Sequence, residues 1–575
     1  MPDFPTPNFN TLNNDLPDGE VFTPGMAEYE AAVSIGNLLY RMITPKAIVL
    51  ARSIHEVQTT VRFAARHSLH LTVKNGGHSY AAYCLNQDGI VLDLKHLRKV
   101  KVDVDGNKVT IQGGAIWKDV YSRLAEYSPR KLVVGGQCPT VGVSGFTLGG
   151  GLSPFSRSYG LGVDSLLEMK IVTADGRLVT VGPDEDDDEK RELFWAVRGG
   201  GGGNFGVTVE IVSRLHELRD GAGLVVCGSL SWKLSRREEE FRGMMEVFNG
   251  TRWPRELTVD AFWHADNGRE LMGDMTVVYN GSMKECMGVI EPLLRFAPDI
   301  NLREMNWMDW VNQEMQGGFG TTSKIYHHHV SFIFGQGAIT PEFVEDVLWL
   351  LKWAKELLSN KELFPVLADQ DCESASGVHF LWDHIGEKTS EVEAEDTAFY
   401  WRKGEYVANI KLSWSHPSQS SHMLDFEKLC KAVLQRYTLN KVASYVNYID
   451  DTEERWQDAY YGENYPRLQR VKKWWDPGNF WRFPQSIGEG LQQIPVLPPS
   501  PPLSPPLSDS RSEPQSPFPS PAAQDLPRRL REPTGQIHKR WEEFSVKNPA
   551  TIQSAGHDVQ RTLAANQATR EHHWR

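Results

Sequence analysis

The hydrophobic pattern between residues 47 and 73 changes its period twice. Residues 47–51, AIVLA, form an uninterrupted apolar run, which is typical of a buried strand. From Ser53 the apolar residues recur at helical spacing, and residues 69–73, LHLTV, alternate as a half-buried strand does. The pattern therefore predicts a strand, a helix and a second strand, followed by the glycine turn of residues 73–80, VKNGGHSY.

Short strands and a few helices are predicted up to residue 215, which indicates an α+β domain over about residues 40–215. A hairpin is expected around Asp175-Gly176, because this dipeptide forms tight turns between alternating runs. The remaining predicted elements are strands at residues 90–94, 100–106 and 108–114 and a helix at 116–127.

A second region, about residues 220–435, mixes longer strands with amphipathic helices, and it predicts a sheet covered by helices. Residues 436–490 are again rich in motifs, and residues 1–39 are set aside as an N-terminal extension. From about residue 491 to 575 the chain is rich in proline and serine, a composition that favours polyproline II or disorder. Such a tail could bind an SH3 or WW domain, but a flexible tail is the preferred interpretation.

The tail is predicted to be dispensable for folding and for cofactor loading. Its composition cannot offset an ordering entropy of roughly 1–2 kcal/mol per residue. A chain that ends near Gln493 should therefore keep the melting temperature and the cofactor content of the full chain. A loss of many degrees in the melting temperature would contradict this prediction.

Charge and cysteine content exclude several classes of protein. The chain has 575 residues, a net charge of −13 and a pI near 5.8, which argue against nucleic acid or an anionic membrane as partner. Its six cysteines are scattered, with no CxxC pair, so neither a disulfide scaffold nor a zinc motif is expected. No signal peptide or membrane-spanning segment is recognised, so a cytoplasmic protein is expected, or a secreted one if the N-terminus is incomplete.

Three glycine clusters are the strongest functional signal. They are Gly76-Gly77, residues 142–151 (GVSGFTLGGG) and residues 198–206 (RGGGGGNFG). Their backbone N–H groups could converge on phosphate oxygens, although tight turns alone would also explain them. The clusters match neither a P-loop nor a Rossmann fingerprint. Together they favour a dinucleotide site, next to which His78 and Cys138 are presented.

Weaker candidates lie elsewhere. His327, His328 and His329 are consecutive, and neighbouring strand residues point to opposite faces, so they are not expected to bind one metal. The acidic run at 184–190 lacks the ligand spacing of a calcium loop, and no metal site is predicted. Arg402 is as consistent with a structural ion pair as with a catalytic role.

These motifs, in this order, resemble the berberine bridge enzyme-like FAD-linked oxidases of the vanillyl-alcohol oxidase superfamily, and fungal members in particular. The similar segments are GGHSY, CPTVGVSGFTLGGG, ELFWAVRGGGGGNFGV, YVNYID and the stretch from YYGENY to FPQSI, all within residues 40–490. The resemblance implies a two-part FAD-binding domain (40–215 and 436–490) and a substrate domain at 220–435.

The resemblance also implies roles for single residues. His78 would bond to the 8α carbon of FAD, and Cys138 would bond to C6 of the ring in a two-bond pattern. Val141 is similar to the gatekeeper type that admits oxygen, and Phe146 stands where many relatives have histidine. The FAD contacts assigned in this way are His78, Cys138, Gly76, Gly77, Ser79, Val141, Gly142, Gly145, Gly149, Gly150, Gly206, Asn447 and Asn479.

Tyr448, in YVNYIDD, is implied to be the catalytic base, with Tyr445 close to the site. If the segment is a regular strand, the two tyrosines point to opposite faces. A free phenol, with a pKa of about 10, is a poor base, so hydrogen bonds or a cation must tune Tyr448. Tyr445 and Arg402 are the candidates for this tuning, and a purely packed Tyr448 is the alternative.

The sequence thus predicts an FAD-dependent oxidase that takes hydride from an alcohol or amine carbon of a secondary-metabolite intermediate and passes the electrons to O2. A small molecule and O2 would be its partners, and the oligomeric state stays open. A carbohydrate oxidase is the alternative within the same class. A flavin-binding scaffold that acts through its Pro-rich tail is the non-enzymatic alternative, and the joint presence of His78, Cys138 and Tyr448 speaks against it.

Overall fold

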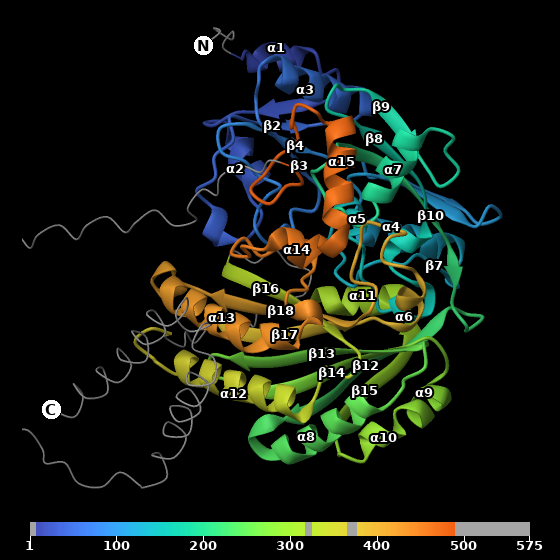
Figure 1. The fold of residues 1–575 in the computed structure, drawn as a ribbon, viewed down its shortest axis with the longest axis vertical. Helices are drawn as coiled ribbons and strands as arrows, with labels where there is room; N and C mark the ends of the chain where they lie inside the picture. The colour runs from blue at the N-terminus through green and yellow to red at the C-terminus, as the bar shows by residue number, and fades with distance from the viewer. Residues whose placement is uncertain (1–6, 317–324, 365–375, 489–575) are drawn as a thin grey trace, which may run out of the picture. The chain divides into compact units, whose positions relative to one another are not determined.

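The computed structural model describes residues 7–316, 325–364 and 376–488. The first compact unit of the chain ends at Gln492, and the Pro-rich tail lies outside the described residues. Three larger sheets form this unit, and their arrangement with the helices is drawn in Figure 1. Within the described ranges, no helix is both long and apolar enough to cross a membrane.

The first sheet has four strands in the order β1-β2-β4-β3. Strands β2 (Ala47–Leu50), β4 (Ile90–Asp93) and β3 (Leu71–Lys74) are parallel, and helix α3 (Ile54–Arg66) links β2 to β3. Ser53 and Glu56 close a capping box at the start of α3, which fixes where the predicted helix begins. Strand β1 (Glu20–Phe22), from the N-terminal segment, adds an antiparallel edge.

The second sheet has five antiparallel strands in the order β5-β6-β10-β8-β9. The predicted hairpin at Asp175-Gly176 is confirmed, with Gly176 at φ 76°. The strands are β5 (Val100–Asp103), β6 (Lys108–Gln112), β8 (Leu166–Val172), β9 (Leu178–Val181) and β10 (Val207–Arg214). Helices α4 (Trp117–Tyr127) and α5 (Val143–Leu148) lie between β6 and β8 along the chain, and α5 carries part of the second glycine cluster.

The third sheet has seven antiparallel strands, and it confirms the helix-covered sheet predicted for the second region. Helices α8 (Leu234–Gly250), α12 (Pro341–Leu358) and α13 (Ser420–Leu434) cover one face, and the other face looks toward the first two sheets (Figure 1). In spatial order the strands are β15 (Asp299–Asn306), β12 (Leu224–Lys233), β14 (Met272–Tyr279), β13 (Leu257–Asp266), β17 (Gly377–His384), β18 (Gly404–Trp414) and β16 (Tyr326–Gly335).

Alternation along these seven strands separates two kinds of side chain. On β13 and β17, Trp263 and Trp382 are buried on the helix-covered side. Polar residues such as Asp260 and Asp383 lie on the opposite face, because successive strand residues point to opposite sides. The face that meets the first two sheets therefore carries acidic side chains among apolar ones. We call it the inner face of the third sheet.

Shorter elements connect the sheets. The helices are α1 (Phe9–Asn14), α2 (Ala27–Val33), α6 (Ser156–Tyr159), α7 (Asp188–Ala196), α9 (Met283–Val289), α10 (Glu291–Leu294), α11 (Trp307–Gln316), α14 (Trp456–Tyr461) and α15 (Tyr465–Trp475), and a small ladder joins β7 (Lys131–Leu132) to β11 (His216–Glu217). Asp187, from the acidic run, caps α7 through the backbone N–H groups of Glu189 and Lys190. Helix α15 packs on α7, so the C-terminal segment returns to the N-terminal half (Figure 1).

Candidate functional site

Two glycine-bearing loops, far apart in sequence, touch each other. One is the turn after β3 that carries His78, and the other is the loop before α5 that carries Cys138. A Cβ atom on Gly76 would lie 2.6 Å from the backbone N of Gly142, so only glycine permits this approach. Gly77, at φ 75°, supplies the left-handed residue of the turn. The close approach brings the two candidate attachment residues together.

His78 and Cys138 meet at one hydroxyl group. The Nε2 atom of His78 lies 2.9 Å from Oγ1 of Thr140, and the Sγ atom of Cys138 lies 3.5 Å from the same oxygen. Burial, with a smaller contribution from the charge of Lys411, lowers the pKa of His78 to about 4. The imidazole is therefore neutral at physiological pH, which is its nucleophilic form. Thr140 was not singled out in the sequence, where nothing distinguishes it from other loop threonines.

The two loops fit the FAD that the sequence resemblance implies. Among the described residues, no backbone acceptor is bonded to the N–H groups of Gly77 and His78. Both residues are half-buried, so their N–H groups are free to donate to a ligand rich in acceptor oxygens. A Cβ atom on Gly145 would meet nothing within 4 Å, so space is open in the first turn of α5. His78, Cys138 and these amides would hold the cofactor.

The YVNY segment is not a regular strand, so the condition for placing its two tyrosines on opposite faces is not met. Residues Val446–Tyr448 form a 3-10 turn, in which positions three apart eclipse each other. The rings of Tyr445 and Tyr448 accordingly lie 5.2 Å apart in an edge-to-face pair. Tertiary contacts outweigh the alternation here, because both rings pack into one core.

Tyr445 and Asn447 fasten this turn to the second glycine cluster. The Tyr445 hydroxyl accepts hydrogen bonds from the backbone N–H of Gly151 and from Nδ2 of Asn447, both at 3.0 Å. Asn447 also donates to the carbonyl of Phe146 at 2.9 Å. The two residues therefore position the turn, and these contacts of Tyr445 do not make Tyr448 a stronger base.

The hydroxyl of Tyr448 donates a hydrogen bond to a carboxylate that the sequence pattern did not reveal. Its oxygen lies 2.6 Å from Oδ2 of Asp383, on the inner face of the third sheet. Burial raises the pKa of Asp383 to about 6, and burial together with Asp383 raises the pKa of Tyr448 well above its usual value. Arg402, one candidate for tuning Tyr448, forms a two-bond pair with Asp164 at 2.9 Å, as the structural alternative predicts. Tyr448 is thus poised as a donor to a carboxylate.

A second buried acid stands beside Asp383. Burial, and then the charge of Asp383, raise the pKa of Asp260 well above its usual value. One oxygen of Asp260 accepts the backbone N–H of His384 at 2.8 Å. The other oxygen contacts Nε2 of Gln137 at 3.1 Å. Because Gln137 precedes Cys138, this bond ties the acidic pair to the loop of Cys138.

Aromatic stacking connects the turn of His78 to strand β16 and to Tyr448. Tyr80, two residues after His78, stacks on His329 with ring centroids 3.6 Å apart. It also stacks on Tyr448 at 5.6 Å. The His78 turn, strand β16 and the catalytic candidates therefore lie together, although the sequence separates them.

The other predicted FAD contacts have structural explanations of their own. Ser79 accepts the N–H of Tyr83 inside its turn, and the carbonyl of Val141 accepts the N–H of Trp117. A Cβ atom on Gly149 would collide with Asn447, one on Gly150 would lie 2.9 Å from Phe399, and one on Gly206 would lie 2.5 Å from Ile171. Asn479 occupies a turn after α15 with φ 48°. Their contacts with FAD stay predictions.

Comparisons with known proteins support an FAD-binding protein. Residues 45–182 match a family described as an FAD binding domain, and residues 444–488 match the family "Berberine and berberine like". An uncharacterized FAD-linked oxidoreductase of Bacillus subtilis is 26% identical over 82% of this chain and 98% of its own. These matches identify the chain as an FAD-linked oxidoreductase that is similar to the berberine bridge enzyme-like proteins.

Two plant proteins are also similar to this oxidoreductase. A monolignol oxidoreductase of Arabidopsis thaliana is 26% identical over 80% of this chain and 87% of its own. The solved structure of Physcomitrella patens BBE-like 1 superposes with a TM-score of 0.71 and 23% identity, over 84% of this chain and 98% of that one. The latter likeness shows that the fold is shared.

His328 of the oxidoreductase has a structural partner set on the helix-covered side of β16. Its Nδ1 lies 2.6 Å from Glu427 of α13, and its Nε2 lies 2.7 Å from Asp451, three residues after Tyr448. Burial opposes protonation of His328, but the two carboxylates outweigh burial and raise its pKa well above the usual value. His328 thus clamps the segment that carries Tyr448 to the third sheet.

We expect His328→Ala to destabilise the folded protein by about 3–5 kcal/mol, because two buried carboxylates would lose their cation. The free energy of unfolding in urea measures this effect. His55→Ala, at an exposed position of α3, is the control and should stay within about 0.5 kcal/mol of the wild type. Equal stability of the two variants would contradict the clamp.

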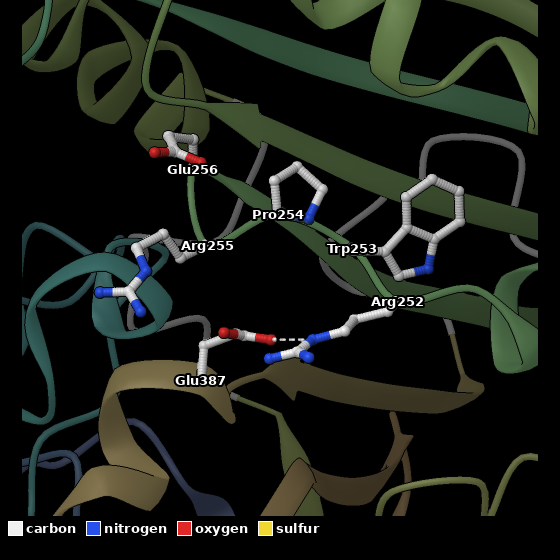
Figure 2. A pocket seen from close by; sticks show the side chains of 6 residues that line it. All are labelled: Arg252, Trp253, Pro254, Arg255, Glu256 and Glu387. Atoms are coloured by element: carbon white, nitrogen blue, oxygen red, sulfur yellow. Dashed lines mark ion pairs between the residues drawn. The ribbon is translucent and has the colours of Figure 1, made fainter.

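A surface pocket of about 400 Å³ lies away from these residues (Figure 2). Arg252 and Glu387 form an ion pair across it at 3.5 Å, and Arg255 and Glu256 also line it. None of the residues assigned to FAD or to catalysis contributes to its lining. Its mixed charges and exposed arginine give it no definite ligand chemistry.

Proposed function

We propose that this oxidoreductase oxidises a carbon that bears a hydroxyl or amine in a small natural product, with O2 as the final electron acceptor. The observation that carries the proposal is the 2.6 Å hydrogen bond from Tyr448 to Asp383, beside the loops of His78 and Cys138. FAD, when bound, supplies the hydride acceptor and returns the electrons to O2 as H2O2.

The residues of the chain supply the proton chemistry. The hydroxyl of Tyr448 accepts the substrate proton while it passes its own proton to Asp383. This relay needs no phenolate in the resting enzyme, which the raised pKa of Tyr448 disfavours. Burial and the charge of Asp383 raise the pKa of Asp260, which disfavours a second negative charge at the site. Tyr448 remains the group that touches the substrate, and Asp383 stores the proton.

FAD is proposed to be attached through both His78 and Cys138. The neutral imidazole of His78 and the shared hydroxyl of Thr140 support this proposal. Each attachment would replace a C–H bond of the flavin by a C–N or C–S bond, with O2 accepting the two electrons and two protons released. Val141, half-buried next to this loop, is proposed to leave a path for oxygen.

Two substrate classes are compatible with this chemistry. A secondary-metabolite alcohol is the first choice, and the name of the Arabidopsis relative, a monolignol oxidoreductase, supports a small organic substrate. An oligosaccharide is the second, and it is supported by a solved structural neighbour, a Phl p 4 variant that is named a glucose oxidase.

A substrate panel tests the proposal. Purified protein should be yellow, lose its colour without oxygen when the right alcohol or amine is added, and recover it in air with release of H2O2. Colour that no member of a broad panel of alcohols, amines and sugars bleaches would contradict the proposed oxidation. Bleaching by oligosaccharides alone would identify the second substrate class.

A further inference from the structure

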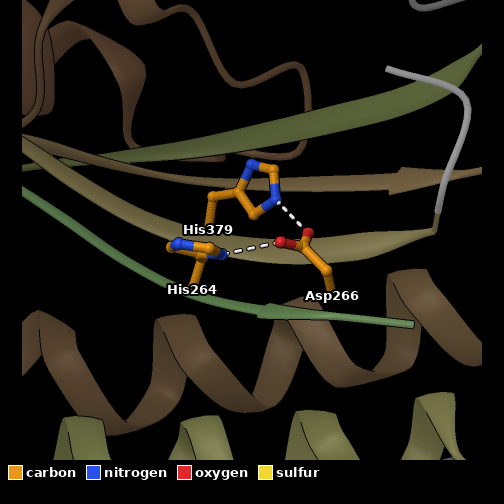
Figure 3. Close-up of side chains that lie close together, drawn as sticks. All are labelled: His264, Asp266 and His379. Atoms are coloured by element: carbon orange, nitrogen blue, oxygen red, sulfur yellow. Dashed lines mark hydrogen bonds and ion pairs between the residues drawn. The ribbon is translucent and has the colours of Figure 1, made fainter. Parts of the chain in front are cut away.

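Four polar side chains lie close together on the inner face of the third sheet, apart from the Asp260–Asp383 pair. They are His264, Asp266, Asp274 and His379. His264 and Asp266 lie two residues apart on β13, so both point to the same face. His379 on β17 is the direct register partner of His264. Figure 3 shows the three side chains on the side of the strands that faces away from the helices. The sheet itself therefore brings them within reach of one another.

The carboxylate of Asp266 lies between the two imidazoles. Its Oδ2 is 2.6 Å from Nδ1 of His264, and its Oδ1 is 2.7 Å from Nε2 of His379. One donor atom from each of the three residues lies within 4.8 Å of the others. Three donors in such a small volume, on rigid strands, can converge on a single ion once the two hydrogen-bonded pairs move slightly apart.

A glycine opposite Asp266 reserves the space for this cluster. Gly377 is the register partner of Asp266. A Cβ atom at Gly377 would lie 2.5 Å from Oδ1 of Asp266 and 2.8 Å from Nε2 of His379. Any side chain at position 377 would push both donors aside, so the arrangement depends on glycine.

We propose that His264, Asp266 and His379 form a binding site for a divalent transition metal of the Zn²⁺ class. Two imidazoles and one carboxylate suit Zn²⁺ and its neighbours, whereas Ca²⁺ and Mg²⁺ prefer oxygen ligands. Three protein ligands leave a coordination position open for water or for an oxygen atom of a bound molecule.

Asp274 supplies the outer support that metal-bound histidines have in proteins. Its Oδ2 lies 3.1 Å from Nε2 of His264, on the far side of the ring from Asp266. A proton on Nε2 held by Asp274 leaves the lone pair of Nδ1 directed at the cluster. The same geometry therefore serves a metal without a rearrangement of Asp274.

The competing arrangement is an ionic network without metal. In it, His264 must carry protons on both nitrogens, since each faces a carboxylate. Lys411, the register partner of His379, adds a positive charge nearby that opposes a cation. Asp266 and Asp274 offset that charge. A metal ion would take the place of the proton between His264 and Asp266.

The site is separate from the proposed proton relay. His379 and Asp383 are four residues apart on β17, which corresponds to about 13 Å along a strand. Both lie on the inner face, so a metal at this site could hold an oxygen-bearing group of a molecule that extends along the sheet. The proposal does not depend on the oxidation proposed above.

Zn²⁺ titration of the full-length flavoprotein tests the site. The protein is first treated with a chelator, then titrated by calorimetry, and its bound zinc is measured after dialysis. The wild type should bind zinc, and His264→Ala and His379→Ala should each lose one equivalent per chain. Asp274→Asn should weaken the same step about 10–100-fold, the usual effect of removing the partner of a metal-bound histidine.

Two further variants guard against misfolding and against zinc bound elsewhere. Gly377→Ala retains all three ligand residues, but its Cβ atom shifts their donor atoms, so this variant should also lose the zinc equivalent. Its flavin absorbance and melting temperature should stay close to those of the wild type. His55→Ala, at an exposed position, should retain it. Zinc content equal in the wild type and in the His264, His379 and Gly377 variants would overturn the proposal, as would a wild type that binds no zinc.

Discussion

Asp383→Asn is expected to slow the reduction of the flavin by substrate about 10²–10⁴-fold, the usual scale for loss of a general base. Asp383 accepts the hydroxyl of Tyr448 at 2.6 Å, so its carboxylate is the place where the substrate proton can end. The amide of asparagine can hold the tyrosine but cannot take its proton. Stopped-flow measurement of flavin reduction without oxygen gives this rate directly.

Tyr448→Phe should cost a similar factor, because it removes the oxygen and keeps the ring that packs against Tyr445 and Tyr80. The double variant should be little slower than either single variant, since both break one relay. Unchanged melting temperature and FAD content are the control. Reduction of Tyr448→Phe at close to the wild-type rate between about pH 6 and 9 would mean that the base lies elsewhere, and Tyr445 would be tested next.

The same relay predicts a pH dependence. The relay requires the ionised form of Asp383, whose pKa burial raises to about 6. The rate of flavin reduction should therefore be constant above this pKa and fall about tenfold per pH unit below it. In Asp383→Asn the fall near pH 6 should disappear. A fall that persists there would assign the titration to another group.

Substitution of both His78 and Cys138 by alanine is expected to abolish covalent attachment of FAD. Acid denaturation of the wild type should leave the flavin on the protein, and His78→Ala alone should retain it through Cys138. The neutral state of His78 and the contacts of both residues with Thr140 are the reasons. Precipitation in acid, followed by the absorbance of pellet and supernatant, measures the bound fraction.

The matched control for Cys138→Ala is Cys84→Ala. Cys84 lies in the same half of the molecule, but burial raises the pKa of its thiol to about 11, which leaves little thiolate. Its substitution should leave attachment unchanged. Complete release of flavin from the wild type in acid would contradict both bonds. An unchanged absorption spectrum in Cys138→Ala would mean that FAD is bonded to His78 only.

Local patterns determined much of this fold and part of its site. The strand, helix and strand of residues 47–74 follow from periodicity and from the Ser53 cap, since both act over a few residues. The glycine clusters and the residues His78 and Cys138 were recognisable because their chemistry is unusual within short loops. The resemblance built on these motifs identified the family and its cofactor.

Only the tertiary structure decided which side chains meet. Tyr448 and Asp383 are 65 residues apart, and His328 is 99 residues from Glu427, so spacing along the chain contains no trace of either contact. Packing turned the YVNY segment into a 3-10 turn, because fixing Tyr445 and Asn447 against the glycine loop outweighs strand alternation. Strand register, which depends on the whole sheet, placed His379 beside His264.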